Sequence, residues 1–290
     1  ANSRVPKAIG RDLKASIEGC NLGERGLTDV VVRYGTAFMK EALEVLNQAI
    51  SKQVNEDLSD SYGFLEGEGK IHIEDRLGGN ESDAIVCIVK WENGILDIDL
   101  TESAGAVKGF INCTYANTVG ACILPFLVEG DISVPYHQAM IDAFRIRTKK
   151  GSLVDAVAPS PVGGGREVTA VSIYTMITRL IRGIVHNNDG FTLQYPPNIV
   201  IQEGRSIDHN MTFSRLNVVY TGESATENRD GWGTHSVLAE GLLASVEDLE
   251  HKMDIRIESR CLVKAICNGN REGGSGVRTQ LVNTGDPVYV

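Results

Sequence analysis

The stretch that decides the fold class runs from Asp83 to Leu100 and has the sequence DAIVCIVKWENGILDIDL. Apolar and polar residues alternate on both sides of Asn93-Gly94, and such alternation predicts half-buried strands. An Asn-Gly pair favours a two-residue hairpin turn, because both residues accept a positive φ at little cost. We therefore predict a hairpin here, with another strand at Gly69–Asp75 before it.

Helical spacing precedes and follows this hairpin. Ile9, Leu13, Ile17 and Cys20 lie three or four residues apart and so share one helix face. We expect Asn21–Gly26 to break this helix and a second helix to continue to about Val54. Further helices are predicted for 116–128, 166–185 and 246–253, and further strands for 95–100, 144–147, 198–202, 211–213, 216–220 and 254–257. Helices and antiparallel hairpins thus come in blocks, which favours an α+β fold.

The composition excludes several classes of protein. The chain has 290 residues, 42% hydrophobic and 23% charged, which are ordinary globular values. A net charge of -10 makes nucleic acid an unlikely main partner, because an acidic surface repels phosphates. No apolar stretch approaches the roughly 20 residues that span a bilayer. We therefore expect a cytoplasmic protein without a membrane or nucleic-acid partner. The chain starts at Ala1 and not at a methionine, which suggests that its start was trimmed or that it is a piece of a longer protein.

The six cysteines form no CxxC pair. Nothing in the sequence indicates secretion, and a chain of this length can build a core without disulfides. We expect reduced thiols that are mostly buried, in keeping with a cytoplasmic protein.

Two carboxylates and a glycine loop are the first candidates for chemistry. Asp97 and Asp99 alternate with Ile98 and so point to the same face of the predicted strand. Paired carboxylates do acid–base work where burial separates their pKa values, although a solvated pair is an equally good interpretation. The loop Gly163–Gly165, followed by Arg166, has backbone N–H groups and a guanidinium that favour an anion, with a close-packing turn as the plainer alternative.

A second glycine-rich place surrounds Trp232. Glycines flank this aromatic on both sides, and His235 follows closely, presented on a constrained turn. An ordinary imidazole pKa near 6.5 permits proton transfer at neutral pH. The sequence contains no phosphate loop, dinucleotide fingerprint, nucleophile elbow or zinc-protease motif. The residues by themselves therefore define a globular α+β chain without a self-sufficient catalytic signature.

Several short segments, taken in chain order, resemble the hydantoinase B/oxoprolinase family, which includes subunits of acetone and acetophenone carboxylases. The segments are Asp12-Leu13-Lys14-Ala15, Tyr34-Gly35, Asp97-Ile98-Asp99-Leu100-Thr101-Glu102-Ser103, Gly109-Phe110-Ile111-Asn112, Gly151-Ser152-Leu153-Val154 and Gly231-Trp232-Gly233, with Gly273-Gly274-Ser275-Gly276 after them. They extend over nearly the whole chain. The resemblance implies that residues 1–290 form the later, C-terminal part of such a subunit.

The family also has an upstream segment with a metal-binding H-x-x-D-x-G-G-like motif, which nothing here matches. The resemblance therefore implies a divalent metal bound outside this chain. It also implies a hydantoinase A-like partner subunit that binds ATP and phosphorylates a carbonyl or enolate oxygen. The family resemblance thus predicts a hetero-oligomer in which this chain is not active alone.

Three functions remain open on this basis. The first is a subunit of an ATP-dependent carboxylase that acts on a ketone and condenses a phosphorylated enol with a carboxyl donor. Within this first function, the alternative reaction is ATP-dependent hydrolysis of a cyclic amide such as a hydantoin, oxoproline or lactam. The second is a catalytically silent structural subunit. The third is an independent hydrolase that uses Asp97 and Asp99.

We expect the site residues to line one cleft or its edge. Asp99 and His235 are the predicted catalytic residues. The predicted substrate-binding residues are Ser103, Asn112, Gly163, Gly164, Gly165, Arg166 and Trp232. These residue types favour binding of an anionic intermediate, because an amide, exposed N–H groups and a guanidinium all donate hydrogen bonds to oxygen.

Overall fold

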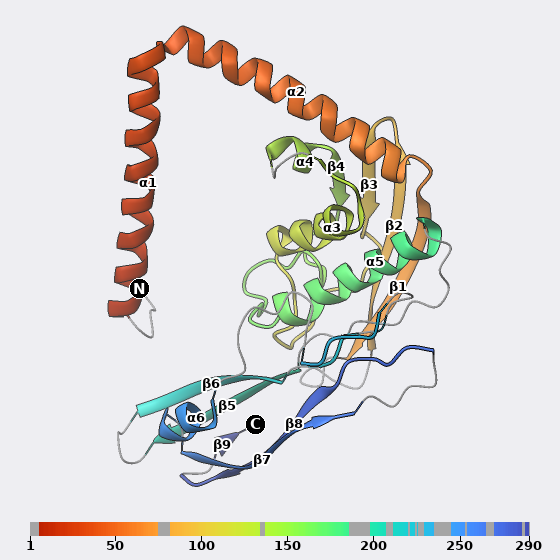
Figure 1. The fold of residues 1–290 in the computed structure, drawn as a ribbon. Coiled ribbons are helices and arrows are strands. Elements are labelled where there is room, and N and C mark those ends of the chain that lie inside the picture. Colours follow the sequence, from red (N-terminus) through yellow and green to blue (C-terminus); the bar gives the residue numbers. More distant parts are fainter. Residues whose placement is uncertain are drawn as a thin grey trace.

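The predicted hairpin forms the middle of a four-stranded sheet in the computed structural model (Figure 1). Its strands are β1 (Glu66–Glu74), β2 (Ser82–Glu92), β3 (Ile95–Asp99) and β4 (Phe144–Arg147), in that order. The first three strands pair antiparallel, and β4 pairs parallel to β3. Asn93 and Gly94 have φ angles of 52° and 79°, so the Asn-Gly turn adopts the left-handed conformation that the sequence predicts.

The structure describes residues 6–74, 82–133, 137–185, 198–206, 211–219, 221–223, 225, 229–234, 245–252, 254–264, 270–285 and 288–289. Within them, helices combine with mostly antiparallel sheets, which confirms the α+β fold class. None of the described helices is long and apolar enough to cross a membrane.

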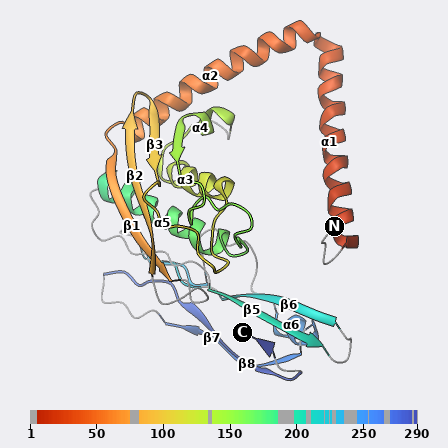
Figure 2. The ribbon, with the colours of Figure 1, turned by 180° about the vertical axis from the view of Figure 1, so that it is seen from behind.

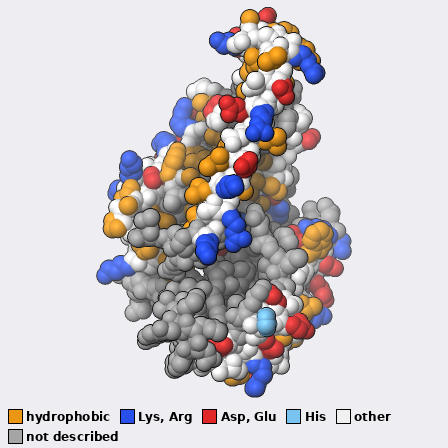
Figure 3. All heavy atoms as spheres, turned by 90° about the vertical axis from the view of Figure 1, so that its left-hand side faces the viewer, with side chains coloured by type: hydrophobic (Ala, Val, Ile, Leu, Met, Phe, Trp, Pro, Cys, Tyr) orange, Lys and Arg blue, Asp and Glu red, His pale blue; other side chains and the backbone are white. Residues whose placement is uncertain are grey.

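The first two helices form an arm, which we define as residues 6–49. Helix α1 (Pro6–Tyr34) is continuous, so the break predicted at Asn21–Gly26 is wrong. Glycine inside a helix costs only about 1 kcal/mol, which lowers its stability without ending it. The chain turns instead at Gly35, where φ is +86°, and α2 (Thr36–Tyr62) begins. Figures 1 and 2 show the arm projecting from the rest of the molecule, and α1 faces the viewer in Figure 3.

Two helices cover one face of the sheet. Helix α3 (Tyr115–Glu129) packs against α5 (Val171–Val185), which continues a short π-helical turn, Arg166–Ala170. Strand β1 carries Gly67 and Gly69 under α5, where an added Cβ would come within 2.6 Å and 2.9 Å of its Ile184 and Met176 side chains. Glycine thus lets this helix lie close on the sheet.

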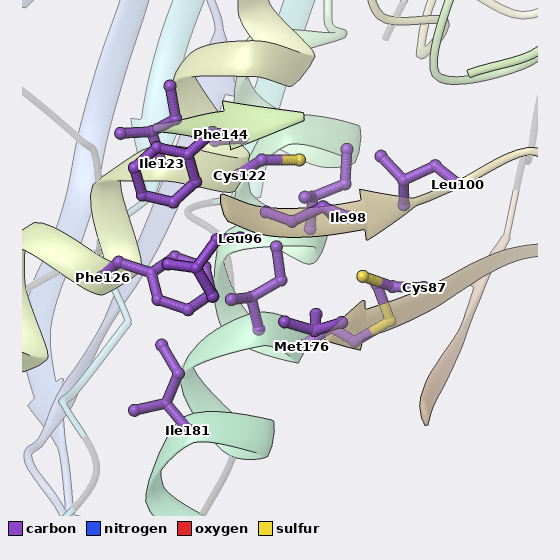
Figure 4. Packing of buried hydrophobic residues seen from close by; sticks show 14 of the residues in the cluster. Cys87, Leu96, Ile98, Leu100, Cys122, Ile123, Phe126, Phe144, Met176 and Ile181 are labelled. Carbon is purple, nitrogen blue, oxygen red and sulfur yellow. The ribbon is translucent and has the colours of Figure 1, made fainter. Parts of the chain in front are cut away.

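The core lies between this sheet, α3, α5 and the last turns of α2 (Figure 4). Phe126 of α3 is fully buried, and its ring centroid lies 5.1 Å from that of Tyr62 and 5.4 Å from that of Phe144. The Tyr62 hydroxyl also donates a 2.8 Å hydrogen bond to the Phe126 carbonyl oxygen. These contacts anchor the C-terminal end of α2, and with it the arm, to the body.

The C-terminal third contains two small sheets. Strands β5 (Asn198–Ser206), β6 (Met211–Val219) and β9 (Val288–Tyr289) form one, and β7 (Ile255–Val263) and β8 (Gly276–Asn283) form the other. The helices α4 (Gln138–Asp142) and α6 (Val246–Lys252) are short. The two strands predicted between 211 and 220 are one strand, because pairing with β5 continues through Ser214 and Arg215.

Candidate functional site

The two predicted carboxylates, Asp97 and Asp99, lie on β3 opposite two arginines of β4. Asp97 Oδ2 lies 3.2 Å from Arg145 Nη1 and Asp97 Oδ1 lies 3.0 Å from Arg147 Nε. Arg147 Nη1 also lies 2.8 Å from Asp99 Oδ2. The parallel register that places Asp97 beside Arg145 and Asp99 beside Arg147 creates this ladder of ion pairs. Both carboxylates are therefore paired with cations.

Asp99 also holds the first turn of the loop that follows its strand. Its Oδ1 accepts hydrogen bonds from the Thr101 backbone N–H at 2.8 Å and from the Thr101 hydroxyl at 2.7 Å. Partial burial raises the pKa of Asp99, but the Thr101 hydrogen bonds and the Arg147 charge outweigh it and leave this pKa below its ordinary value. Asp99 is thus a stable anion at neutral pH.

Ser103 fixes the same loop to the neighbouring strand. It is buried, and its hydroxyl oxygen lies 3.2 Å from both the backbone N and the carbonyl oxygen of Val86. One residue on, the Ala104 carbonyl accepts a 2.9 Å hydrogen bond from Leu153 N–H, and the Leu153 carbonyl accepts one of 2.7 Å from Cys113 N–H. A backbone chain therefore connects Ser103 to the Asn112 segment.

Asn112 is 0% exposed and binds backbone groups on two different loops. Its Oδ1 accepts a 2.7 Å hydrogen bond from Val107 N–H. Its Nδ2 donates to the carbonyl oxygens of Val107, Gly109 and Pro161, each at 2.9 Å. The Asn112 side chain therefore joins the 107–112 loop to the 161–166 loop. We call these two loops and their contacts the loop lock.

The glycine loop completes the loop lock from the other side. Gly164 N–H donates a 2.8 Å hydrogen bond to the Phe110 carbonyl. A Cβ on Gly164 would meet the Phe110 ring at 2.6 Å, and a Cβ on Gly165 would meet the Asn112 carbonyl oxygen at 2.1 Å. Two adjacent glycines are thus needed for this close approach. The structure thus brings Asn112 beside Gly163–Gly165, with the Asn112 side chain buried between the two loops.

Arg166 follows this loop and lines a groove of about 660 Å³ along α3. The groove is mostly apolar. Its lining residues include Ala116, Val119, Gly120, Ile123, Leu124 and Leu127 of α3. A pocket with an apolar lining and a few polar groups is the usual form of a small-molecule site. The apolar stretch 116–128 predicts a buried helix, whereas the structure leaves one face of α3 open.

Trp232 belongs to a second glycine cluster near the C-terminus. Its carbonyl accepts a 2.9 Å hydrogen bond from Glu223 N–H, and the Gly274 N–H donates a 2.8 Å bond to the Glu223 carbonyl. A Cβ on Gly274 would meet the Trp232 carbonyl oxygen at 1.9 Å. The Arg229 guanidinium lies 5.0 Å from the Trp232 ring, which is 64% exposed. His235, the other residue predicted here, lies outside the described residues.

The cysteines bear on the prediction of reduced, mostly buried thiols. Cys87, Cys113 and Cys122 are buried free thiols, whereas Cys20 and Cys261 are exposed. Burial, aided by the nearby Asp99 charge, raises the pKa of the Cys87 thiol to about 12. The buried thiols are therefore protonated core residues.

The described residues do not fit a metal centre. No group of three or more His, Cys, Asp or Glu side chains within them is arranged to hold an ion. Asp97 and Asp99, the nearest approach to a carboxylate pair, have arginines as partners.

The described α+β body thus combines the loop lock with an apolar groove along α3. The model of the hydantoinase B/oxoprolinase family matches residues 1–290, and the chain belongs to that family. The caprolactamase subunit beta of Pseudomonas jessenii is 24% identical over an alignment of 280 residues, which covers 93% of this chain and 47% of that protein. The uncharacterized protein MJ0963 of Methanocaldococcus jannaschii is 22% identical over 181 residues, which are 62% of this chain and 31% of that protein.

Solved structures confirm this fold. The ATP-dependent caprolactamase from Pseudomonas jessenii matches with a TM-score of 0.72 and 21% identity over 93% of this chain and 48% of its own. Nucleotide-free acetone carboxylase matches with a TM-score of 0.70 and 14% identity over 96% of this chain and 39% of its own. The chain spans less than half the length of each of these relatives.

Proposed function

We propose that this chain is part of the B-type subunit of an ATP-dependent enzyme that acts at a carbonyl carbon of a small molecule. The observation that carries the proposal is the family match over all 290 residues. A hydantoinase A-like partner subunit binds ATP and phosphorylates the carbonyl oxygen, and any divalent metal lies outside this chain. The product of that step is a small molecule with an apolar carbon skeleton and an anionic phosphoryl group.

The groove along α3 suits such a molecule. Its apolar lining accommodates the carbon skeleton, and Arg166 at its edge places a permanent positive charge beside the phosphoryl oxygens. In this proposal Asp99, Ser103, Asn112 and Gly163–Gly165 act indirectly, because their contacts fix the loops that present Arg166. We also propose that Trp232 and His235 contribute to the edge of this cleft.

Two reactions fit this arrangement. We place hydrolysis of a cyclic amide first, because the alignment that covers 93% of this chain is with a caprolactamase subunit. Carboxylation of a ketone, which the sequence alone placed first, is the second candidate, supported by the likeness to acetone carboxylase. In the first reaction water adds to the phosphorylated amide carbon, phosphate leaves, and the ring C–N bond breaks as the nitrogen takes up a proton. In the second the carbon of the enol phosphate bonds to the carboxyl carbon of bicarbonate as the enol O–P bond breaks, and phosphate leaves with one oxygen from bicarbonate.

Product analysis of the native complex separates the two candidates. The complex is incubated with ATP and either cyclic amides or ketones with labelled bicarbonate. Amide hydrolysis yields an amino acid and no fixed label, whereas carboxylation yields a labelled keto acid. Turnover of neither class would contradict the proposed function.

Arg166 provides the test of the site itself. We expect Arg166→Met to lower kcat/KM of the complex about 100-fold, because loss of a charge-assisted contact to a phosphoryl group costs about 2–3 kcal/mol. Arg179→Met is the matched control, since Arg179 is an exposed arginine of α5 outside the groove lining. Equal effects of the two substitutions would exclude the groove as the site.

A further inference from the structure

Helix α1 carries an apolar stripe that the described residues leave exposed. The stripe consists of Ile9, Leu13, Ile17, Cys20 and Leu27, spaced three, four or seven residues apart. Ile9 is 45% exposed, and Leu13, Ile17 and Leu27 are each 58–59% exposed. At 100° per residue, the charged side chains of Arg11, Glu18 and Arg25 fall on the opposite face. Glu24 is a charged residue within the stripe. Such a helix normally buries its stripe against another surface.

The arm keeps this stripe away from the chain's own core. The last turns of α2 are anchored in the body by buried Val54, Leu58 and Tyr62. Its first turns are exposed, with Phe38 at 56%. The positive φ at Gly35 then directs α1 away instead of back along α2 (Figures 1 and 2). Since most helical stability in proteins comes from packing of an amphipathic face, the stripe indicates a partner surface.

The composition of the stripe argues against a second copy of this chain as that partner. Leu13, Cys20 and Leu27 repeat every seven residues, as in one line of a coiled-coil seam. With these three residues at the d positions of the heptad, the a positions are Gly10, Ile17 and Glu24. A parallel second copy would therefore bring two Glu24 carboxylates together in the seam and leave a gap at Gly10. A different surface, with a bulky side chain opposite Gly10 and a basic or polar group opposite Glu24, fits better.

The lengths of the relatives identify that surface. The caprolactamase subunit beta matches 93% of this chain with 47% of its own length, so as much polypeptide again accompanies the matched region. The solved caprolactamase chain shows the same proportion, 93% against 48%. We propose that the stripe of α1 docks against the portion of a hydantoinase B-type subunit that lies outside the matched region, whether on the same chain or on another. This inference rests on the family and not on the proposed reaction, so its test needs no activity.

Cys20 allows the docking to be tested by cross-linking, because it is an exposed member of the stripe. The tagged chain is purified alone and labelled at Cys20 with a photoactivatable maleimide, after Cys261→Ser and Cys267→Ser remove two other thiols. The labelled chain is then assembled with the rest of the native complex, and the assembled complex is irradiated. Mass spectrometry should identify a peptide from the hydantoinase B-type portion outside the matched region. The control places the label on the other side of α1, by Leu22→Cys with Cys20→Ser, and should give at least tenfold less of that peptide.

Each other outcome overturns the proposal. A cross-link to a second copy of this chain assigns the stripe to self-association, and one to the ATP-using subunit makes the arm a contact between different subunits. Equal yields from positions 20 and 22, or no cross-link from Cys20 in the assembled complex, show that the stripe has no docked partner.

Substitutions provide an independent measurement. Leu13→Glu with Ile17→Glu should weaken capture of the hydantoinase B-type portion at least tenfold. Leu22→Glu with Val32→Glu should leave it unchanged, since these exposed apolar residues lie off the stripe, at 70% and 80% exposure. Circular dichroism of the isolated chain shows whether each pair keeps its helix content. Equal loss of capture in both folded variants would contradict the proposal.

Discussion

The loop lock makes Asn112→Asp a sharp test of how the site is held. The substitution keeps the shape of the side chain and the acceptor for Val107 N–H, but removes the donor that serves three carbonyl oxygens. An unsatisfied buried carbonyl costs about 1–3 kcal/mol, and an amide has two hydrogens to lose. Because the site is 0% exposed, solvent does not replace them. We expect about 3–5 kcal/mol of destabilisation at pH 7.5.

The pH dependence of this variant gives the sign of the effect. Burial and the facing carbonyls raise the folded-state pKa of the new carboxyl above the unfolded value of about 3.9. The destabilisation is then complete above the folded-state pKa and shrinks as pH falls towards about 4. Urea unfolding followed by circular dichroism measures it, with Asn47→Asp on exposed α2 as the control. A difference below about 1 kcal/mol at pH 7.5, unchanged at low pH, would refute the reasoning.

Three further predictions concern neighbouring parts of the molecule. Gly165→Ala should lower the free energy of unfolding by at least about 2 kcal/mol, because its Cβ would meet a backbone oxygen at 2.1 Å. Gly163→Ala, where an added Cβ enters open space, should leave this free energy unchanged. Similar urea midpoints for the two variants would count against the close approach. Asp99 has a lowered pKa, so its stabilisation of the fold is present above about pH 4 and is lost as pH falls through the folded-state pKa. Asp99→Asn should therefore reduce the loss of unfolding free energy that the protein shows at acid pH. The same loss in the variant and the wild type would contradict this prediction. In the isolated, folded chain a thiol reagent should label Cys20 quickly and Cys87 only after unfolding, and fast labelling of Cys87 would show that it is not buried.

Local patterns predicted the elements well. The Asp83–Leu100 hairpin and the strand 144–147 follow from alternation and an Asn-Gly turn, which depend on neighbours in sequence. The helix break at Asn21–Gly26 was wrong, because turn-forming residues lower helix stability without determining where a helix ends. The actual turn at Gly35 depends on one backbone angle, for which the sequence allows many alternatives.

The site depends on contacts that no local pattern contains. The Asp97–Arg145 pair joins residues 48 positions apart and needs the parallel register of β3 and β4. Asn112 acts on backbone atoms, including the Pro161 carbonyl 49 positions away, so residue types alone give no signal for it. The alternating arginines of the strand 144–147 match the alternating aspartates of β3, and this match is a sequence signal for the ion pairs between the two strands.

The central claim is that this chain works in an ATP-dependent enzyme acting on a carbonyl group. The most direct measurement is ATP consumption by the purified native complex, with and without cyclic amides or ketones plus bicarbonate. The account predicts that one of these substrate classes raises ATP consumption at least tenfold, and that product appears only when ATP is present. Product formation without ATP, or ATP consumption that neither class stimulates, would contradict it.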